Sequence, residues 1–189
     1  MPIKARRPLK LPTPERLANI ALHYLGRYAA SEASLRRVLR NRLRRATMRD
    51  PAFAADTERQ KQLHNAIETI IEKHRKLGIL NDASYAAMKH DSLRRQGRSS
   101  RAIHQKLLIK GIDKRLIEET LKPYEEDHSE RELGAAHKLA KRKKLGPYAV
   151  GAIDNAKHTK HIAIMARAGF TFDTIKKVLG GEIPEDFSD

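Results

Sequence analysis

The sequence predicts an all-α protein built from three tandem three-helix, helix-turn-helix-like repeats. Apolar residues recur at steps of three and four, no segment shows the alternation of a strand, and a helix–glycine–helix unit occurs twice. Of the 189 residues, 40% are hydrophobic and 33% are charged, so apolar material is sparse. Stacked repeats bury surface mainly against their neighbours, which predicts an elongated arrangement and suits this composition.

The first repeat is predicted over residues 15–78, after a flexible basic tail over residues 1–14. Four prolines interrupt the tail and disfavour helix or strand there. Thr13 is a suitable N-cap and Pro14 a suitable first helical residue, so a helix is expected to begin there. Ser31 is expected to begin the second helix. That helix is expected to break at Asp50-Pro51, and a third helix is expected from about residue 57 to residue 77, before Gly78.

The second repeat is predicted over residues 79–123 and the third over residues 124–180, with an acidic tail over residues 181–189. The expected helices end at or shortly before glycine or proline, and those of the second repeat begin near a capping residue. In the second repeat, the expected starts are Asn81-Asp82, Ser99 or Ser100, and Asp113. In the third repeat, helices are expected at about 127–144, 155–168 and 172–179, with residues 146–154 as a loop.

A helix–glycine–helix unit occurs at residues 103–121 and again at residues 161–179. When Gly111 and Gly169 are aligned, both copies have isoleucine six residues later and leucine ten residues later. A weaker copy follows Ser31, where leucines recur at the same spacing. The match predicts that the same supersecondary unit is repeated along the chain.

The chain carries 39 lysines and arginines against 23 acidic residues, a formal net charge of +16. Residues 1–50 hold 13 of the basic residues and three of the acidic ones. Such a surplus points to a polyanionic partner, with nucleic acid first and an acidic membrane surface second. No apolar run reaches the roughly 18 residues of a membrane span, and no secretory signal is evident, so a cytoplasmic protein is expected.

Arginines cluster at two places that could contact phosphates. Steps of about 100° per residue place the first cluster opposite the apolar stripe of its helix. The second straddles Gly97, between two expected helices. Arg42 falls inside the apolar arc, so its stem either passes the core or reaches a partner. The eight candidate residues for contact with DNA or a protein–DNA filament are Arg36, Arg37, Arg40, Arg44, Arg94, Arg95, Arg98 and Arg101.

No pattern typical of an enzyme is present. The chain has no cysteine, no glycine-rich phosphate loop and no His-Glu-x-x-His, which excludes thiol nucleophiles and the common zinc and nucleotide motifs. His158 and His161 lie three residues apart, but Asp154 is the only nearby carboxylate, so surface histidines are expected rather than zinc ligands. No catalytic residue, metal or cofactor is therefore expected.

Residues 99–122 could form a DNA-reading helix-turn-helix. The second helix of that unit contains Glu118-Glu119 and lacks the Asn, Gln and Arg set of a recognition helix. Charge therefore predicts binding that is largely independent of sequence. Two alternatives remain open: a helix-turn-helix-like nucleic-acid-binding regulator, and a helical scaffold whose charge serves only solubility.

Four blocks of the sequence, taken together, are specific enough to indicate a protein family. They are Ala21-Leu22, Leu25, Arg27-Tyr28, Ser31 and Leu35-Arg36; Gly78-Ile79-Leu80-Asn81-Asp82 with Tyr85-Ala86; Gly97-Arg98, Arg101-Ala102-Ile103, Leu107 and Lys110-Gly111-Ile112; and Leu145-Gly146-Pro147 with Met165-Ala166-Arg167-Ala168-Gly169-Phe170. Over residues 15–180 the chain resembles the RecX family, the bacterial regulatory proteins of the RecA recombinase. The last block is similar to the proteobacterial, particularly the alphaproteobacterial, branch.

The resemblance implies a curved, elongated chain of three repeats and a regulator rather than an enzyme. It implies binding in the groove of the RecA–single-stranded-DNA filament and inhibition of the ATPase, strand-exchange and coprotease activities of RecA. Three segments depart from the family pattern: Ser99-Ser100, the long insertion at 46–62, and the loop 146–157. A monomer is expected because no heptad seam is present. Binding to double-stranded DNA and the helix-turn-helix alternative without a RecA partner stay open.

Overall fold

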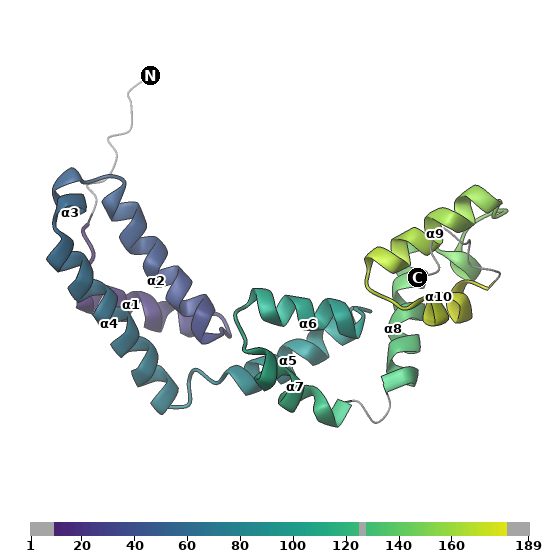
Figure 1. Cartoon of the computed structure of the whole chain (residues 1–189), viewed down its shortest axis with the longest axis horizontal. Coiled ribbons are helices and arrows are strands. Elements are labelled where there is room, and N and C mark those ends of the chain that lie inside the picture. The colour runs from purple at the N-terminus through teal and green to yellow at the C-terminus, as the bar shows by residue number, and fades with distance from the viewer. Residues whose placement is uncertain (1–9, 125–127, 181–189) are drawn as a thin grey trace, which may run out of the picture. The chain divides into compact units, whose positions relative to one another are not determined.

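The computed structural model describes residues 10–124 and 128–180, and every regular element in these ranges is a helix (Figure 1). The all-α prediction is therefore confirmed. The chain divides into two compact units, Met1–Tyr85 and Ala86–Asp189. The division into three repeats stays a prediction. The predicted basic tail is described only from residue 10, and the predicted acidic tail at 181–189 lies outside the described residues.

The helices of the first unit begin at the capping residues that the sequence indicates. Thr13 Oγ1 accepts a hydrogen bond from the Arg16 N–H at 3.3 Å, and Ser31 Oγ accepts one from the Ser34 N–H at 3.2 Å. These side chains satisfy amides that have no partner within the helix. The four helices that follow are α1 (Pro14–Leu25), α2 (Glu32–Thr47), α3 (Pro51–Ala55) and α4 (Thr57–Lys76).

The short helix α3 was not predicted, because Asp50-Pro51 was interpreted only as a break. The Asp50 carboxylate accepts the Phe53 N–H at 3.0 Å, and Pro51 occupies the first helical position. The dipeptide that ends α2 therefore also begins α3. Within the 46–62 insertion, Phe53 is buried, so this segment contributes to the core of the first unit.

The core of the first unit lies between α1, α2 and α4 (Figure 1). The apolar stripes expected on the three helices supply most of it, but Tyr28 and Leu77, which fit those stripes, are 57% and 62% exposed. Helix α4 ends at Lys76, and Gly78 at φ 70° turns the chain, so Leu80 is buried in place of Leu77. The buried hydrophobic residues from the three helices are Leu17, Ala21, Leu35, Leu39, Leu43, Ala46, Leu63, Ile67, Ile70 and Ile71.

The start of the fifth helix, α5 (Asp82–Arg95), belongs to the first unit. The Asp82 carboxylate accepts the Glu32 N–H at 2.9 Å, so the first residues of α2 and α5 are bonded together. Burial raises the pKa of Asp82, and the hydrogen bond from Glu32 opposes that shift. The first unit therefore extends beyond Gly78, the end of the predicted first repeat.

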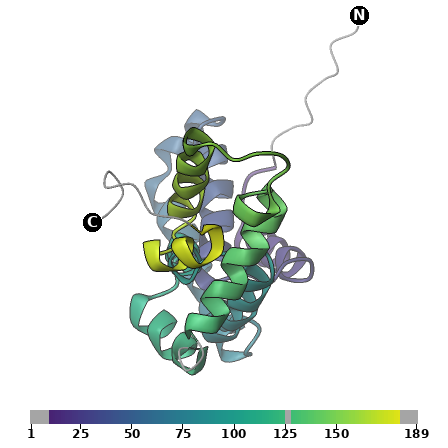
Figure 2. The ribbon, with the colours of Figure 1, turned by 90° about the vertical axis from the view of Figure 1, so that its right-hand side faces the viewer.

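Among the described residues, the second unit contains the rest of α5 and five further α-helices (Figure 2). In that view the yellow α10 lies beside the green α8, which it contacts. Residues 146–148, expected as part of a loop, form one 3₁₀ turn. The five helices are α6 (Ser100–Ile109), α7 (Lys114–Leu121), α8 (His128–Lys143), α9 (Asn155–Arg167) and α10 (Phe172–Leu179).

The two aligned glycines form the same turn. Gly111 has φ 78° and Gly169 has φ 88°, so both copies of the unit turn through the left-handed region. The next residues, Ile112 and Phe170, are buried and donate backbone hydrogen bonds to the carbonyl five residues earlier, at 3.2 and 3.3 Å. The helix–glycine–helix units predicted from the sequence thus share one backbone geometry.

Candidate nucleic-acid interface

The eight predicted arginines lie on two helical segments, one in each compact unit. The first segment is α2, which carries six arginines and one acidic residue, Glu32. The second is the junction between α5 and α6, around Gly97. Both segments carry exposed arginines, and Arg94 of the second segment differs from them in its surroundings.

Arg36 and Arg40 of α2 form ion pairs with one carboxylate of α4. Arg36 Nε lies 3.0 Å from Glu68 Oε2, and Arg40 Nη2 lies 3.0 Å from Glu68 Oε1. Helix α4 therefore holds both guanidinium groups with a single carboxylate. The other two predicted arginines of α2, Arg37 and Arg44, are exposed.

A second group of basic side chains, around the C-terminal end of α2, is not among the residues predicted as a site. Lys10, Arg42, Arg45 and Arg49 line one surface pocket of about 330 Å³, which we name the α2 basic pocket. Its remaining lining comes from Pro12, Ala46 and Met48. The signal was present in the sequence, because residues 42, 45 and 49 recur at helical steps of three and four. The sequence could not show that Lys10 lies beside them.

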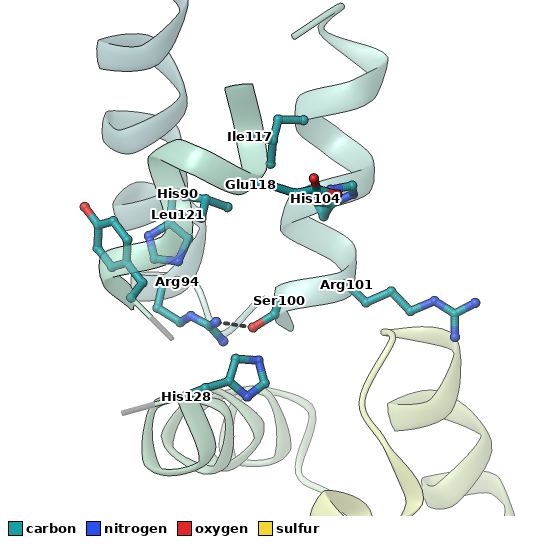
Figure 3. A pocket seen from close by; sticks show the side chains of 10 residues that line it. His90, Arg94, Ser100, Arg101, His104, Ile117, Glu118, Leu121 and His128 are labelled. Atoms are coloured by element: carbon teal, nitrogen blue, oxygen red, sulfur yellow. Dashed lines mark hydrogen bonds between the residues drawn. The ribbon is translucent and has the colours of Figure 1, made fainter. Parts of the chain in front are cut away.

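Arg94 is a partly buried structural residue. Its Nη1 lies 2.6 Å from Glu132 Oε2 of α8, with the two side chains only 15% and 8% exposed. Glu132 also accepts the Ser100 N–H at 3.1 Å and the Ser100 hydroxyl at 2.8 Å. Figure 3 shows Arg94 turned toward Ser100, to which its Nη2 donates. Arg94 therefore joins α5, α6 and α8 rather than facing solvent.

The other three arginines of this junction differ from Arg94. Arg95 and Arg101 are exposed, and in Figure 3 Arg101 extends away from Arg94. Arg98 is half-buried, and its Nε, like that of Arg94, has no hydrogen-bond partner among the described residues. The structure therefore does not bring Arg94 and Arg101 together on one face.

A cavity of about 260 Å³ lies beside Arg94 (Figure 3). The His90 ring lines it and packs against the Tyr124 ring, with the ring centroids 4.1 Å apart and the ring planes tilted by 51°. Burial lowers the pKa of His90 and so favours the neutral imidazole. The hydrogen bond to Asp91 opposes that shift. The Ser100 hydroxyl in this cavity donates to Glu132 and accepts from Arg94, so it belongs to the hydrogen-bonded network that joins α5, α6 and α8.

The two histidines that were weighed as zinc ligands have structural partners. His161 Nδ1 accepts the Gly146 N–H at 3.1 Å, and His158 Nε2 lies 2.9 Å from the Gly180 carbonyl oxygen. Within residues 10–124 and 128–180, no three side chains of His, Asp or Glu are grouped as a metal site would need. In the same ranges, no helix has the length and apolarity to span a membrane.

Comparisons with known proteins converge on a single family. Residues 81–121 match the family model described as RecX, second three-helix domain. Regulatory protein RecX of Myxococcus xanthus (strain DK1622) is 39% identical over 175 residues, which span 92% of this chain and 89% of that protein. Regulatory protein RecX of Agrobacterium fabrum (strain C58 / ATCC 33970) is 32% identical over 100 residues, 53% of this chain and 51% of that protein.

Solved structures share the fold. The crystal structure of RecX from Lactobacillus salivarius has a TM-score of 0.60 and 22% identity, covering 87% of this chain and 93% of that one. A crystal structure of a regulatory protein RecX has a TM-score of 0.62 and 19% identity, covering 89% of this chain and 72% of that one. At these identities the structures support the arrangement of helices and not the role of any residue.

Proposed function

Because this chain belongs to the RecX family of regulatory proteins, we propose that it regulates the RecA recombinase by binding the RecA–single-stranded-DNA filament. Family membership supports RecA as the regulated protein. The observation that supports contact with a polyanionic filament is helix α2, whose six arginines are offset by one acidic residue of its own. Guanidinium groups bind phosphate oxygens through paired, charge-assisted hydrogen bonds.

In this proposal the protein affects RecA by binding and not by a reaction of its own. A basic protein that occupies the filament adds positive charge beside the DNA backbone and obstructs the surfaces that RecA uses. Its ATPase, strand-exchange and coprotease activities would then fall together. We further propose that the protein acts in the cytoplasm, where RecA filaments form, and as a monomer.

The helix-turn-helix alternative receives less support. Helices α6 and α7 do form such a unit, but Glu118 and Glu119 on α7 are exposed. Two carboxylates on the second helix would face the phosphates of a duplex and weaken binding. A sequence-specific duplex footprint that survives moderate salt would favour this alternative.

The experiment that tests the proposal is ATP hydrolysis by RecA on circular single-stranded DNA, with this protein added up to one molecule per RecA. A dose-dependent fall in hydrolysis is expected, together with slower strand exchange and slower repressor cleavage. Addition of the protein to RecA already assembled on DNA separates filament binding from competition for free DNA. Unchanged rates in all three assays at the highest dose would overturn the proposal.

A further inference from the structure

We infer that the α2 basic pocket, formed by Lys10, Arg42, Arg45 and Arg49, is a binding site for the phosphodiester backbone of single-stranded DNA. The inference rests on the proposed function and deepens it, because it names the residues of the first unit that would hold the DNA. It also distinguishes these residues from the predicted face of α2, where Arg36 and Arg40 are already in ion pairs.

Charge is the first argument. Among the described residues, no carboxylate lies within ion-pair distance of any of the four cations. The nearest acidic residue in sequence, Asp50, accepts the Phe53 N–H at the start of α3. Like charges gathered in one pocket repel each other, and an anionic ligand removes that repulsion.

The helix dipole does not account for this gathering. The carbonyl end of α2 favours cations in its last turn, which explains Arg45 there. Arg49, however, lies beyond the C-cap Met48, and Lys10 comes from the segment that precedes α1. Charges from outside the helix converge on the same pocket, which points to a ligand rather than to helix stability alone.

The chemistry of the lining favours phosphate over an acidic protein segment. The four polar side chains of the pocket are hydrogen-bond donors without acceptor capacity. A phosphodiester presents acceptor oxygens only, whereas a peptide brings N–H groups that would need acceptors. Met48, 77% exposed at the pocket, offers an apolar surface to a base. Unpaired bases are accessible in a single strand, so single-stranded DNA is the favoured ligand.

The pocket is held in place by packed structure. Arg42 and Arg45 stand on α2, which is anchored in the core by the buried Leu43 and Ala46. On the other side, Arg16 Nη1 donates to the Leu11 carbonyl at 2.7 Å and fixes the segment next to Lys10. Because these contacts hold the backbone of both walls, the entropy lost when an anion binds is mainly that of the basic side chains.

The test is binding of fluorescein-labelled oligothymidylate, followed by anisotropy across a salt series. The pocket variant is Arg42→Gln/Arg45→Gln/Arg49→Gln. The matched control is Arg27→Gln/Lys61→Gln/Lys73→Gln, which removes three exposed charges from the same unit. The pocket variant is expected to bind about tenfold or more weakly, with the slope of log affinity against log salt reduced by about two, since each phosphate contact contributes about 0.7. Circular dichroism should show equal helix content for both variants.

The control is expected to change affinity by about twofold at most, because diffuse charge at a distance is screened. Equal losses in the two triple variants would overturn the inference, since the effect would then be one of net charge. Lys10→Gln provides a second variant outside every helix, so its effect cannot come from a damaged α2. It is expected to weaken binding about three- to fivefold, and an unchanged affinity would count against the pocket.

RecA ATP hydrolysis with the same proteins distinguishes the inference from the proposed function. If the unmodified protein binds oligothymidylate through the pocket but leaves RecA unaffected, the proposed function fails and the pocket stands. If it inhibits RecA while the pocket variant binds DNA normally, the pocket inference fails and the function stands. A pocket variant that keeps DNA binding but loses inhibition would assign the pocket to an acidic protein surface and overturn the inference.

Discussion

The arginines of α2 and Arg94 at the α5–α6 junction have the same chemistry and opposite surroundings. Arg40 pairs with Glu68 at the surface, where the two side chains are 54% and 47% exposed. Arg94 pairs with Glu132 in the interior, where they are 15% and 8% exposed. Surface ion pairs contribute little to stability, whereas breaking a buried pair leaves a charge without compensation. Basic helical segments that look alike in sequence can thus hold their guanidinium groups at the surface or in the interior.

The largest effect should come from the interior pair. Glu132→Gln leaves the Arg94 guanidinium buried beside a neutral amide, so the free energy of unfolding should fall by about 3–5 kcal/mol. Urea denaturation followed by circular dichroism measures the change. Glu130→Gln, an exposed position on the same helix, is the control and should have almost no effect. Similar losses for both variants would contradict the structural role of Arg94 and Glu132.

A smaller effect should separate the glycine of this junction from a glycine in open surroundings. Gly97 and Gly78 have almost the same backbone φ, 71° and 70°. A Cβ at residue 97 would lie 2.9 Å from the Ala135 carbonyl oxygen, whereas one at residue 78 would meet nothing within 4 Å. Gly78→Ala should therefore cost about 1–2 kcal/mol from the left-handed backbone alone. Gly97→Ala should cost about 2–4 kcal/mol because a steric clash is added.

The two alanine variants are compared by thermal and urea denaturation. Equal destabilisation would show that the backbone conformation dominates and that α5–α6 does not approach α8 as closely as the structure indicates.

The smallest effect should come from the surface pair of α2. Arg40→Gln removes one of the two guanidinium groups bound to Glu68, so it should lower the free energy of unfolding by about 1 kcal/mol or less. The difference from the unmodified protein should shrink at high salt, where exposed charges are screened. Urea denaturation at low and high salt measures this difference. Arg44→Gln, at an exposed position of the same helix, is the control. A loss as large as that of Glu132→Gln would remove the distinction between the two regions.

Helix boundaries were predictable because local groups decide them. Thr13, Ser31 and Ser99 each accept a backbone N–H at a helix start, as their residue types indicate. The left-handed turns at Gly111 and Gly169 follow from the same local logic. Burial near a helix end was predicted less well. Leu77 fits the apolar stripe of α4, but it falls after the last turn of the helix and is exposed.

The candidate site was predictable in part. Helical spacing correctly separates Arg36 and Arg40 from the buried stripe of α2, but it does not show that α4 brings Glu68 to them. The same spacing left the exposed Arg42 unexplained, because its companion Lys10 is distant in sequence. For Arg94, the sequence indicates a basic helix end, and only the fold shows that Glu132 comes from 38 residues away.

The sequence by itself determines the helical class, the caps and turns, the excess of positive charge and the membership of a family. These depend on side chains acting on their own backbone or on totals that do not change with folding. Only the tertiary structure decides which arginines are neutralised, which one is buried and which converge with Lys10 in the α2 basic pocket. Ion pairing and burial depend on atoms that folding brings within a few ångströms, and helical periodicity gives no information about which atoms those are.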